Sequence, residues 1–350
     1  MLKDRDLSFD AFRGLAIIGV VVMHAAYEGF STRTAPNGQW NFSFLVAYCQ
    51  LLDFAVPAFL FISGYWVSKE SIKSLEDYKT FLIRRLSRVL IPYLFWSFIL
   101  LGYAAIKTHN IDIQQITSKL LTGRASTIYF FALMIAQLYV ITPLLHYINR
   151  RGYGLTLVII LNIISLLVLY LSRLYEVIGY LPARLPFYLW VIFYEMGLLA
   201  GGGDDREISL KNVRPFILPA ILAGALVSEL EGFVILSKFD NIFFAVSATK
   251  YSSFLYSVFV ILGFLVLREH IGHWPKFLVV MGRCSFGIYL IHIIILTRVA
   301  GLIRHIGIIY LFQPVYQLII VSLTLLICLL FIVAARRLLP ESFCRKVLGF

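Results

Sequence analysis

The chain has 350 residues, of which 60% are hydrophobic and 14% are charged, and its mean hydropathy is +0.85. Because about a quarter of the residues in a soluble domain are charged, this composition excludes a soluble globular protein and indicates a protein of the lipid bilayer. The formal net charge of +12 does not indicate nucleic acid binding, since the basic residues form short clusters between apolar runs instead of one basic stripe. The four cysteines have no CxxC spacing, so neither a metal site nor a disulfide framework is expected.

Apolar segments that could cross a membrane follow one another along the chain. A spanning helix needs about 20 apolar residues, and about ten candidates have centres near Gly19, Ala55, Phe98, Gln137, Leu161, Phe193, Leu222, Val260, Ile288 and Leu325. The sixth is short, and residues 233–246, after the seventh, are a candidate re-entrant or interfacial segment. The connecting segments are short. The sequence therefore predicts an all-α polytopic bundle of about ten transmembrane helices, with residues 1–350 as a single transmembrane domain and no appended soluble domain.

The basic residues predict how this bundle is oriented. If the N-terminus is cytoplasmic and the spans alternate, most of the 31 Lys and Arg residues fall on the cytoplasmic side. An excess of basic residues in the cytoplasmic loops sets the orientation of membrane proteins. Both termini are therefore predicted to be cytoplasmic. The expected location of this multi-pass protein is the bacterial inner membrane.

Two ionisable residues in the first apolar segment are the first functional candidates. Arg13 and His24 are eleven positions apart, which at about 3.6 residues per turn returns to nearly the same helix face. Each ionisable group in a membrane costs about 2.5 to 3.5 kcal/mol on insertion scales, so it rarely persists without a partner or a function. Arg13 alone is also explained by anchoring to lipid phosphate, and His24 by a neutral ring bonded to a carbonyl. In the functional interpretation, the imidazole of His24 is a general base, since its ordinary pKa is about 6.5.

These residues resemble a known signature. Phe12-Arg13-Gly14-Leu15, with His24 eleven positions after Arg13, is similar to the first motif of the membrane-bound acyltransferase-3 family, whose members O-acylate polysaccharides, lipopolysaccharide and peptidoglycan. Further matches follow in order: Val56–Tyr65, Arg85-Leu-Ser-Arg88 with Ile91-Pro92-Tyr93, Tyr129-Phe130-Phe131 with Tyr139 and Pro143, and Gly282–His292. The family often has Trp where this chain has Tyr129. The resemblance implies transfer of an acyl group, most commonly acetyl from acetyl-CoA, to a carbohydrate hydroxyl.

The other catalytic candidates lie in the second and ninth segments. Asp53 is expected at the depth of His24, where its carboxylate would accept a hydrogen bond from the imidazole and fix the tautomer; the alternative is a helix-end residue hydrated by an outer loop. Ser285, Tyr289 and His292 recur at i, i+4 and i+7 on one helix face. His292 is a further catalytic candidate, and Ser285 and Tyr289 are candidates for binding the donor, with hydrogen bonding between helices as the alternative.

Arg85 and Arg88, together with Arg13, are the candidates for binding the phosphates of acyl-CoA. Guanidinium groups bind phosphate oxygens bidentately, and these residues lie on the side from which cytosolic acetyl-CoA would arrive. Arg85 and Arg88 are three positions apart and are expected to share a helix face. The alternative is that this cluster, which includes Arg84, serves only the orientation of the protein.

The predicted function is therefore transfer of an acyl group from cytosolic acyl-CoA to a hydroxyl of a cell-surface glycan or lipid-linked sugar, with His24 as the base. A secondary transporter, or a carrier of acyl groups across the membrane, is the main alternative, since polar groups at mid-membrane are common to both classes. Carriers often have two similar halves and helices broken near the bilayer centre, and the sequence shows neither. A membrane sensor or scaffold is a third interpretation, which requires the Arg13 and His24 pair to be dispensable.

Overall fold

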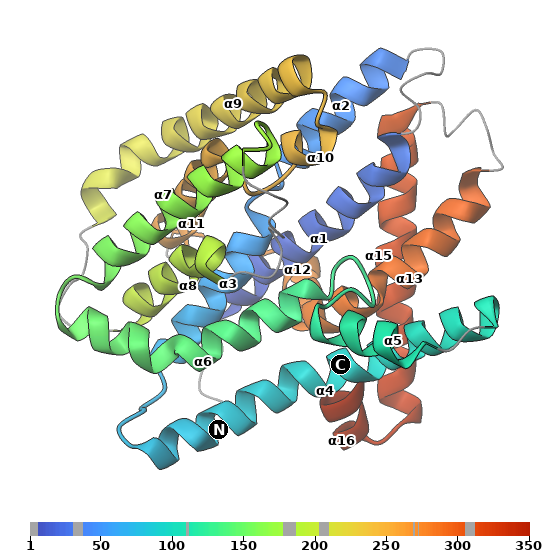
Figure 1. The fold of residues 1–350 in the computed structure, drawn as a ribbon, viewed down its shortest axis with the longest axis horizontal. Coiled ribbons are helices and arrows are strands. Elements are labelled where there is room, and N and C mark those ends of the chain that lie inside the picture. Colours follow the sequence, from blue (N-terminus) through green and yellow to red (C-terminus); the bar gives the residue numbers. More distant parts are fainter. Residues whose placement is uncertain are drawn as a thin grey trace.

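The structure is a computed structural model that describes residues 6–30, 38–109, 112–177, 187–202, 210–268, 270–271, 273–304 and 312–350. All secondary structure in these ranges is helical (Figure 1). Within these ranges, eight segments are long and apolar enough to cross a membrane: α1 (Leu7–Gly29), α2 with α3 (Gly38–Ser68), α4 (Leu75–Thr108), α6 (Phe130–Arg150), α7 (Gly154–Arg173), α9 (Arg214–Phe239), α13 (Ser285–Arg304) and α15 (Gln313–Leu338). Two shorter apolar helices are α8 (Phe187–Gly201) and α11 (Tyr251–Leu267).

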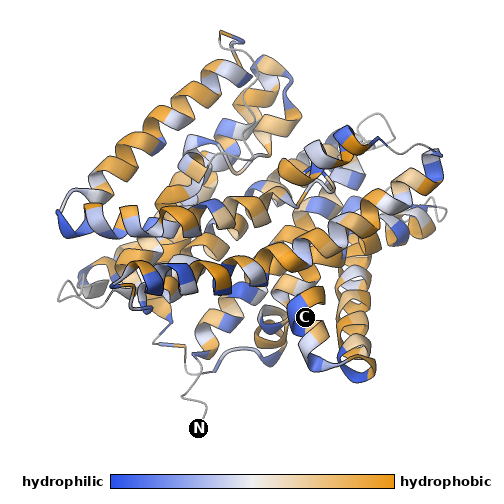
Figure 2. Cartoon of the chain, turned by 60° about the horizontal axis from the view of Figure 1, so that its bottom comes forward, coloured by the Kyte–Doolittle hydropathy of each residue, from blue (hydrophilic) through white to orange (hydrophobic). Residues whose placement is uncertain are grey.

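The prediction of an all-helical polytopic membrane protein is confirmed. Each of the ten predicted centres lies in one of these segments. Figure 2 shows hydrophobic residues along the middle of the long helices and hydrophilic residues at many of their ends, as expected of helices that cross a bilayer. The remaining helices are short: α5 (Ile113–Leu121), α10 (Ile242–Ala245), α12 (Lys276–Arg283), α16 (Glu341–Phe343), and the single turns Leu210–Val213 and Cys344–Leu348.

The second segment is broken, which differs from the expectation of continuous helices. α2 (Gly38–Gln50) ends before a turn at residues 51–54, and α3 (Ala55–Ser68) begins directly after it. Pro57 explains the break, because proline has no N–H to donate to the carbonyl of residue 53 and its ring clashes with that carbonyl. The turn places Asp53 in the interior, where its side chain is fully buried.

Residues 233–246 are not a separate re-entrant segment. α9 continues through Phe239 and ends at Asp240, whose backbone is left-handed at φ 45°. Aspartate tolerates this conformation better than most residues, so the chain turns here and forms the single helical turn of α10. The stretch is therefore the end of one spanning helix and its connection to α11.

Glycines allow two pairs of helices to cross with their backbones in contact. α1 packs against α12 at Gly14 and Gly282, and α3 packs against α8 at Gly64 and Gly197. A Cβ added to any of these four glycines would lie within 2.0 Å of a backbone oxygen of the opposite helix. Small residues of this kind are what lets helices approach closely in a bilayer. The first crossing brings the C-terminal end of α12 next to Arg13.

Candidate active site

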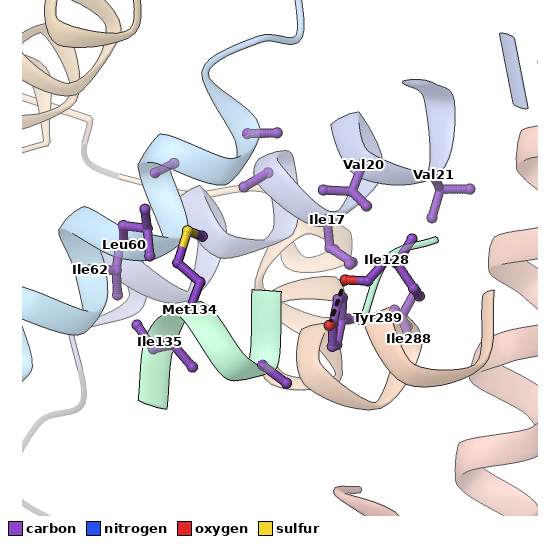
Figure 3. Close-up of a cluster of buried hydrophobic side chains, with 14 of the residues drawn as sticks. Ile17, Val20, Val21, Leu60, Ile62, Ile128, Met134, Ile135, Ile288 and Tyr289 are labelled. Atoms are coloured by element: carbon purple, nitrogen blue, oxygen red, sulfur yellow. Dashed lines mark hydrogen bonds between the residues drawn. The ribbon is translucent and has the colours of Figure 1, made fainter. Parts of the chain in front are cut away.

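A cavity of about 330 Å³ lies between α1, α3, α4, α6, α12 and α13. Five of the predicted site residues lie in its wall: Arg13, His24, Arg85, Ser285 and Tyr289. The rest of the wall is largely apolar, and Figure 3 shows part of it, with Val20, Ile62, Ile128, Ile135 and Tyr289 labelled. The structure therefore brings residues from the first, third and ninth predicted segments to one cavity.

The α1 side of the cavity carries Arg13 and His24, as the helical spacing predicts. Arg13 is partly buried, and its guanidinium lies 3.7 Å from the carboxylate of Asp10. Arg283, at the end of α12, also lines the cavity, and its Nε lies 3.2 Å from the same carboxylate. Asp10 itself is only 2% exposed and does not line the cavity. Its carboxylate therefore lies behind the cavity wall and binds both guanidinium groups. The sequence does not show this arrangement, because it depends on how closely Gly282 packs against α1.

Arg85 supplies a third guanidinium group to the cavity, from α4. Its Nε donates a hydrogen bond of 2.9 Å to the carboxylate of Glu70, which also binds Arg84. The guanidinium carbon of Arg85 lies 5.8 Å from the centre of the Tyr139 ring, and the Tyr139 hydroxyl is 3.0 Å from the hydroxyl of Ser63. Tyr139 and Ser63 both line the cavity. Glu70 and Tyr139 together fix the orientation of Arg85.

Arg88, which was expected to share this face, is exposed and lies outside the cavity wall. Three residues advance about 300° around a helix, so Arg88 is rotated by about 60° from Arg85. That rotation is enough to turn its side chain away from the narrow space that Arg85 reaches. The i, i+3 spacing predicts proximity on the helix but not entry into the same cavity.

Comparisons with known proteins identify the family of this chain. The chain matches the sequence profile of the acyltransferase-3 family, described as an acyltransferase domain, over residues 6–333. It belongs to this family. The chain is also 27% identical over 256 residues to the "Putative membrane-bound acyltransferase YfiQ" of Bacillus subtilis (strain 168), which covers 69% of this chain and 68% of that protein. No solved structure matches it. The protein is therefore a multi-pass membrane acyltransferase.

In this acyltransferase, Asp53 has different partners from the one predicted. Its carboxylate accepts a hydrogen bond of 2.6 Å from Ser253 and lies 3.3 Å from Nζ of Lys250. Lys250 also donates to the carbonyl oxygen of Ala245 at 2.8 Å, and the side chains of Asp53 and Lys250 are both fully buried. A buried carboxylate needs a cation or donors nearby, and Lys250, at the start of α11, meets that need in place of His24. Asp53 does not line the cavity.

This ion pair predicts a change in stability when one partner is removed. Asp53→Asn leaves the ammonium of Lys250 buried without its counter-charge, which typically costs about 3 to 5 kcal/mol. We expect a clear loss of folded protein, measured by thermal unfolding in detergent. The double variant Asp53→Asn with Lys250→Met removes both charges and should recover much of the loss. An Asp53→Asn protein as stable as the wild type but unable to transfer acyl groups would contradict a structural role and restore Asp53 to the reaction.

His292 is next to His24 but outside the cavity wall. The centres of the two imidazole rings are 5.4 Å apart, and His292 is fully buried. Its Nδ1 lies 3.0 Å from the carbonyl oxygen of Ile288 and 2.9 Å from that of Tyr289. The helix that carries His292 therefore fixes its ring, while His24 is half-buried and faces the cavity.

Ser285 and Tyr289 line the cavity from α13, and the hydroxyl of Tyr289 has a separate packing role. It donates a hydrogen bond of 2.9 Å to the carbonyl oxygen of Ile128, drawn as a dashed line in Figure 3. The hydroxyl of Tyr129 donates at 2.8 Å to the carbonyl oxygen of Leu290. These two bonds join α13 to the segment before α6. The ring of Tyr289 faces the cavity while its hydroxyl holds two parts of the wall together.

Proposed function

We propose that this acyltransferase transfers an acyl group, acetyl in the commonest case, from cytosolic acyl-CoA to a hydroxyl of a cell-surface glycan or lipid-linked sugar. In this proposal, both termini are cytoplasmic and the membrane is the bacterial inner membrane. The observation that carries the proposal is the cavity in which three guanidinium groups and one imidazole face the same space. Guanidinium groups can bind the phosphates of an acyl donor. An imidazole can take the proton of a hydroxyl that attacks a thioester.

The guanidinium groups of Arg13, Arg85 and Arg283 suit the donor. Coenzyme A carries a pyrophosphate and a 3′-phosphate, and guanidinium groups bind phosphate oxygens through two parallel hydrogen bonds. The three groups come from different helices, and each is held by a carboxylate, Asp10 or Glu70, that is not part of the cavity wall. A phosphate in the cavity would meet these cations without meeting an opposing carboxylate. The apolar part of the wall suits the uncharged arm and the acyl group of the donor.

His24 suits the chemical step. Its imidazole would take the proton of the acceptor hydroxyl as that oxygen attacks the carbonyl carbon of the thioester. The carbon–sulfur bond then breaks, and the leaving sulfur takes a proton from the imidazolium to give the free thiol of coenzyme A. The products are an ester on the sugar and a neutral His24. No covalent intermediate on the protein is required for this step.

Loss of the gene should remove one kind of acyl group from the cell surface. We expect mass spectrometry of surface glycans to show a single acyl mass missing from a deletion strain and restored by the wild-type gene. In inside-out membrane vesicles of the complemented strain, [1-14C]acetyl-CoA should label the same glycan or lipid-linked fraction. Label that enters the lumen of the vesicles as free acetate or acetyl-CoA, with no ester formed, would contradict the proposal and favour a carrier.

A further inference from the structure

We propose that His292 is a positioning residue for His24, and that its Nε2 accepts a hydrogen bond from the imidazole of His24. The second nitrogen of His24 is then left as the base that faces the acceptor hydroxyl. This inference rests on the proposed function, and it replaces the role that the sequence predicted for Asp53. Three observations carry it: the tautomer of His292, the unused acceptor on its ring, and the distance between the two rings.

The surroundings of His292 determine which nitrogen carries its proton. Nδ1 lies within 3.0 Å of two carbonyl oxygens, those of Ile288 and Tyr289. A carbonyl oxygen can only accept a hydrogen bond, so Nδ1 must be the nitrogen with the hydrogen. In the neutral ring Nε2 is then an acceptor with a free lone pair. The backbone of α13 therefore supplies His292 as a fixed acceptor.

The acceptor on this ring has no other use among the residues that the structure describes. Nε2 of His292 is buried and has no hydrogen bond partner there. Because a buried polar atom without a partner costs about 1 to 3 kcal/mol, it needs an explanation. The imidazole of His24, on α1, lies beside that of His292, on α13. The two ring centres are 5.4 Å apart, and the ring planes are inclined to each other by 47°.

His24 is the more exposed ring of the pair. His292 is fully buried and held at Nδ1, whereas His24 is half-buried and borders the open space of the cavity. The proposed bond requires a rotation of His24 about its side-chain torsions that brings one of its nitrogens to Nε2 of His292, from a ring-centre distance of 5.4 Å. Hydrogen bonds between catalytic groups are often long or misaligned without substrate and tighten when it binds. The observed separation suits a bond that forms when the acceptor sugar fills the cavity.

Two carboxylates that could have oriented His24 have other partners. Asp53 is bonded to Lys250 and Ser253, and Glu28, four residues after His24, forms an ion pair with Arg304. A neutral acceptor can do the orienting work that a carboxylate does in a serine protease triad, since both fix the tautomer of the catalytic imidazole.

The test compares two substitutions of His292 with a matched control. His292→Leu removes the acceptor, whereas His292→Gln places an amide oxygen at a similar distance from the backbone. His146 in α6 is the control, because its Nε2 is also buried without a partner but His146 does not line the cavity. Turnover is followed with [1-14C]acetyl-CoA in inside-out vesicles that contain their own acceptor, at equal amounts of folded enzyme.

We expect His292→Leu to lower kcat by about 10- to 100-fold, the range found when a group that orients a histidine ligand of a metal is removed. The KM for acetyl-CoA should stay unchanged, His292→Gln should recover much of kcat, and His146→Leu should match the wild type. Wild-type turnover in His292→Leu, or a Gln variant no better than Leu, would overturn the inference.

A His24→Ala protein in the same assay separates this inference from the proposed function. If His24→Ala is inactive while His292→Leu is normal, only the role of His292 fails. If His24→Ala retains full turnover, the proposed base itself is wrong, and the role of His292 fails with it.

Discussion

Replacing His24 with alanine is expected to lower acyl transfer by about 100- to 10,000-fold, the range that a general base contributes. The imidazole lines the cavity together with three guanidinium groups, and unlike them it can accept a proton from a hydroxyl near neutral pH. The side chain is half-buried at the edge of an open space, so its removal enlarges the cavity without cutting into the packed core. Alanine is also the best helix former, so α1 should remain intact.

The measurement is transfer of label from [1-14C]acetyl-CoA to the glycan fraction, at matched levels of folded protein in the membrane. His146→Ala changes an imidazole outside the cavity and should leave transfer at the wild-type level. Binding of acetyl-CoA to His24→Ala should persist, because the arginines that would hold the phosphates are unchanged. Transfer above a tenth of the wild-type rate in His24→Ala would exclude this residue as the general base.

The sequence predicts the parts of this site that follow from one helix. Arg13 and His24 share a face of α1 because of their spacing alone, and both line the cavity. The fold class follows from composition and the lengths of the apolar segments, and the structure has those segments. Arg85, Ser285 and Tyr289, which the family motifs single out, also line this cavity although they are distant in the chain.

Contacts between helices could not be predicted in this way. Arg283 reaches the cavity only because Gly282 lets α12 lie against the backbone of α1. Asp53 pairs with Lys250, almost 200 residues away, and no periodicity connects the two. Burial explains this error: the cost of a buried carboxylate predicts that Asp53 has a partner, but the partner is whichever cation the packing brings close. The sequence pattern around a buried charged residue therefore predicts that the residue has a partner. Which residue that partner is depends on tertiary packing.

A substitution at the crossing of α3 and α8, Gly197→Ala, is expected to have the second large effect. It should reduce the amount of folded protein and leave the catalytic residues themselves unchanged. A Cβ at Gly197 would lie 2.0 Å from the carbonyl oxygen of Phe61 and 2.7 Å from the backbone nitrogen of Tyr65. Both atoms belong to the backbone of α3, so no side chain can rotate away to make room. Gly197→Ala must push the two helices apart. Overpacking in a close-packed interior costs about 1 to 3 kcal/mol and more where the backbone must shift, so we expect little folded protein.

Gly102 in α4 provides a matched control, because a Cβ added there meets nothing within 4 Å. The same glycine-to-alanine change at this position should be neutral or stabilising by up to about 1 kcal/mol, since alanine favours helix more than glycine does. Thermal unfolding and size-exclusion chromatography in detergent compare the two variants. α8 contributes no residue to the cavity wall, whereas α3 contributes Ser63 and Trp66. Any Gly197→Ala protein that does fold should therefore have a displaced wall and reduced transfer, and a variant as stable and active as Gly102→Ala would show that the backbones of α3 and α8 are not in contact.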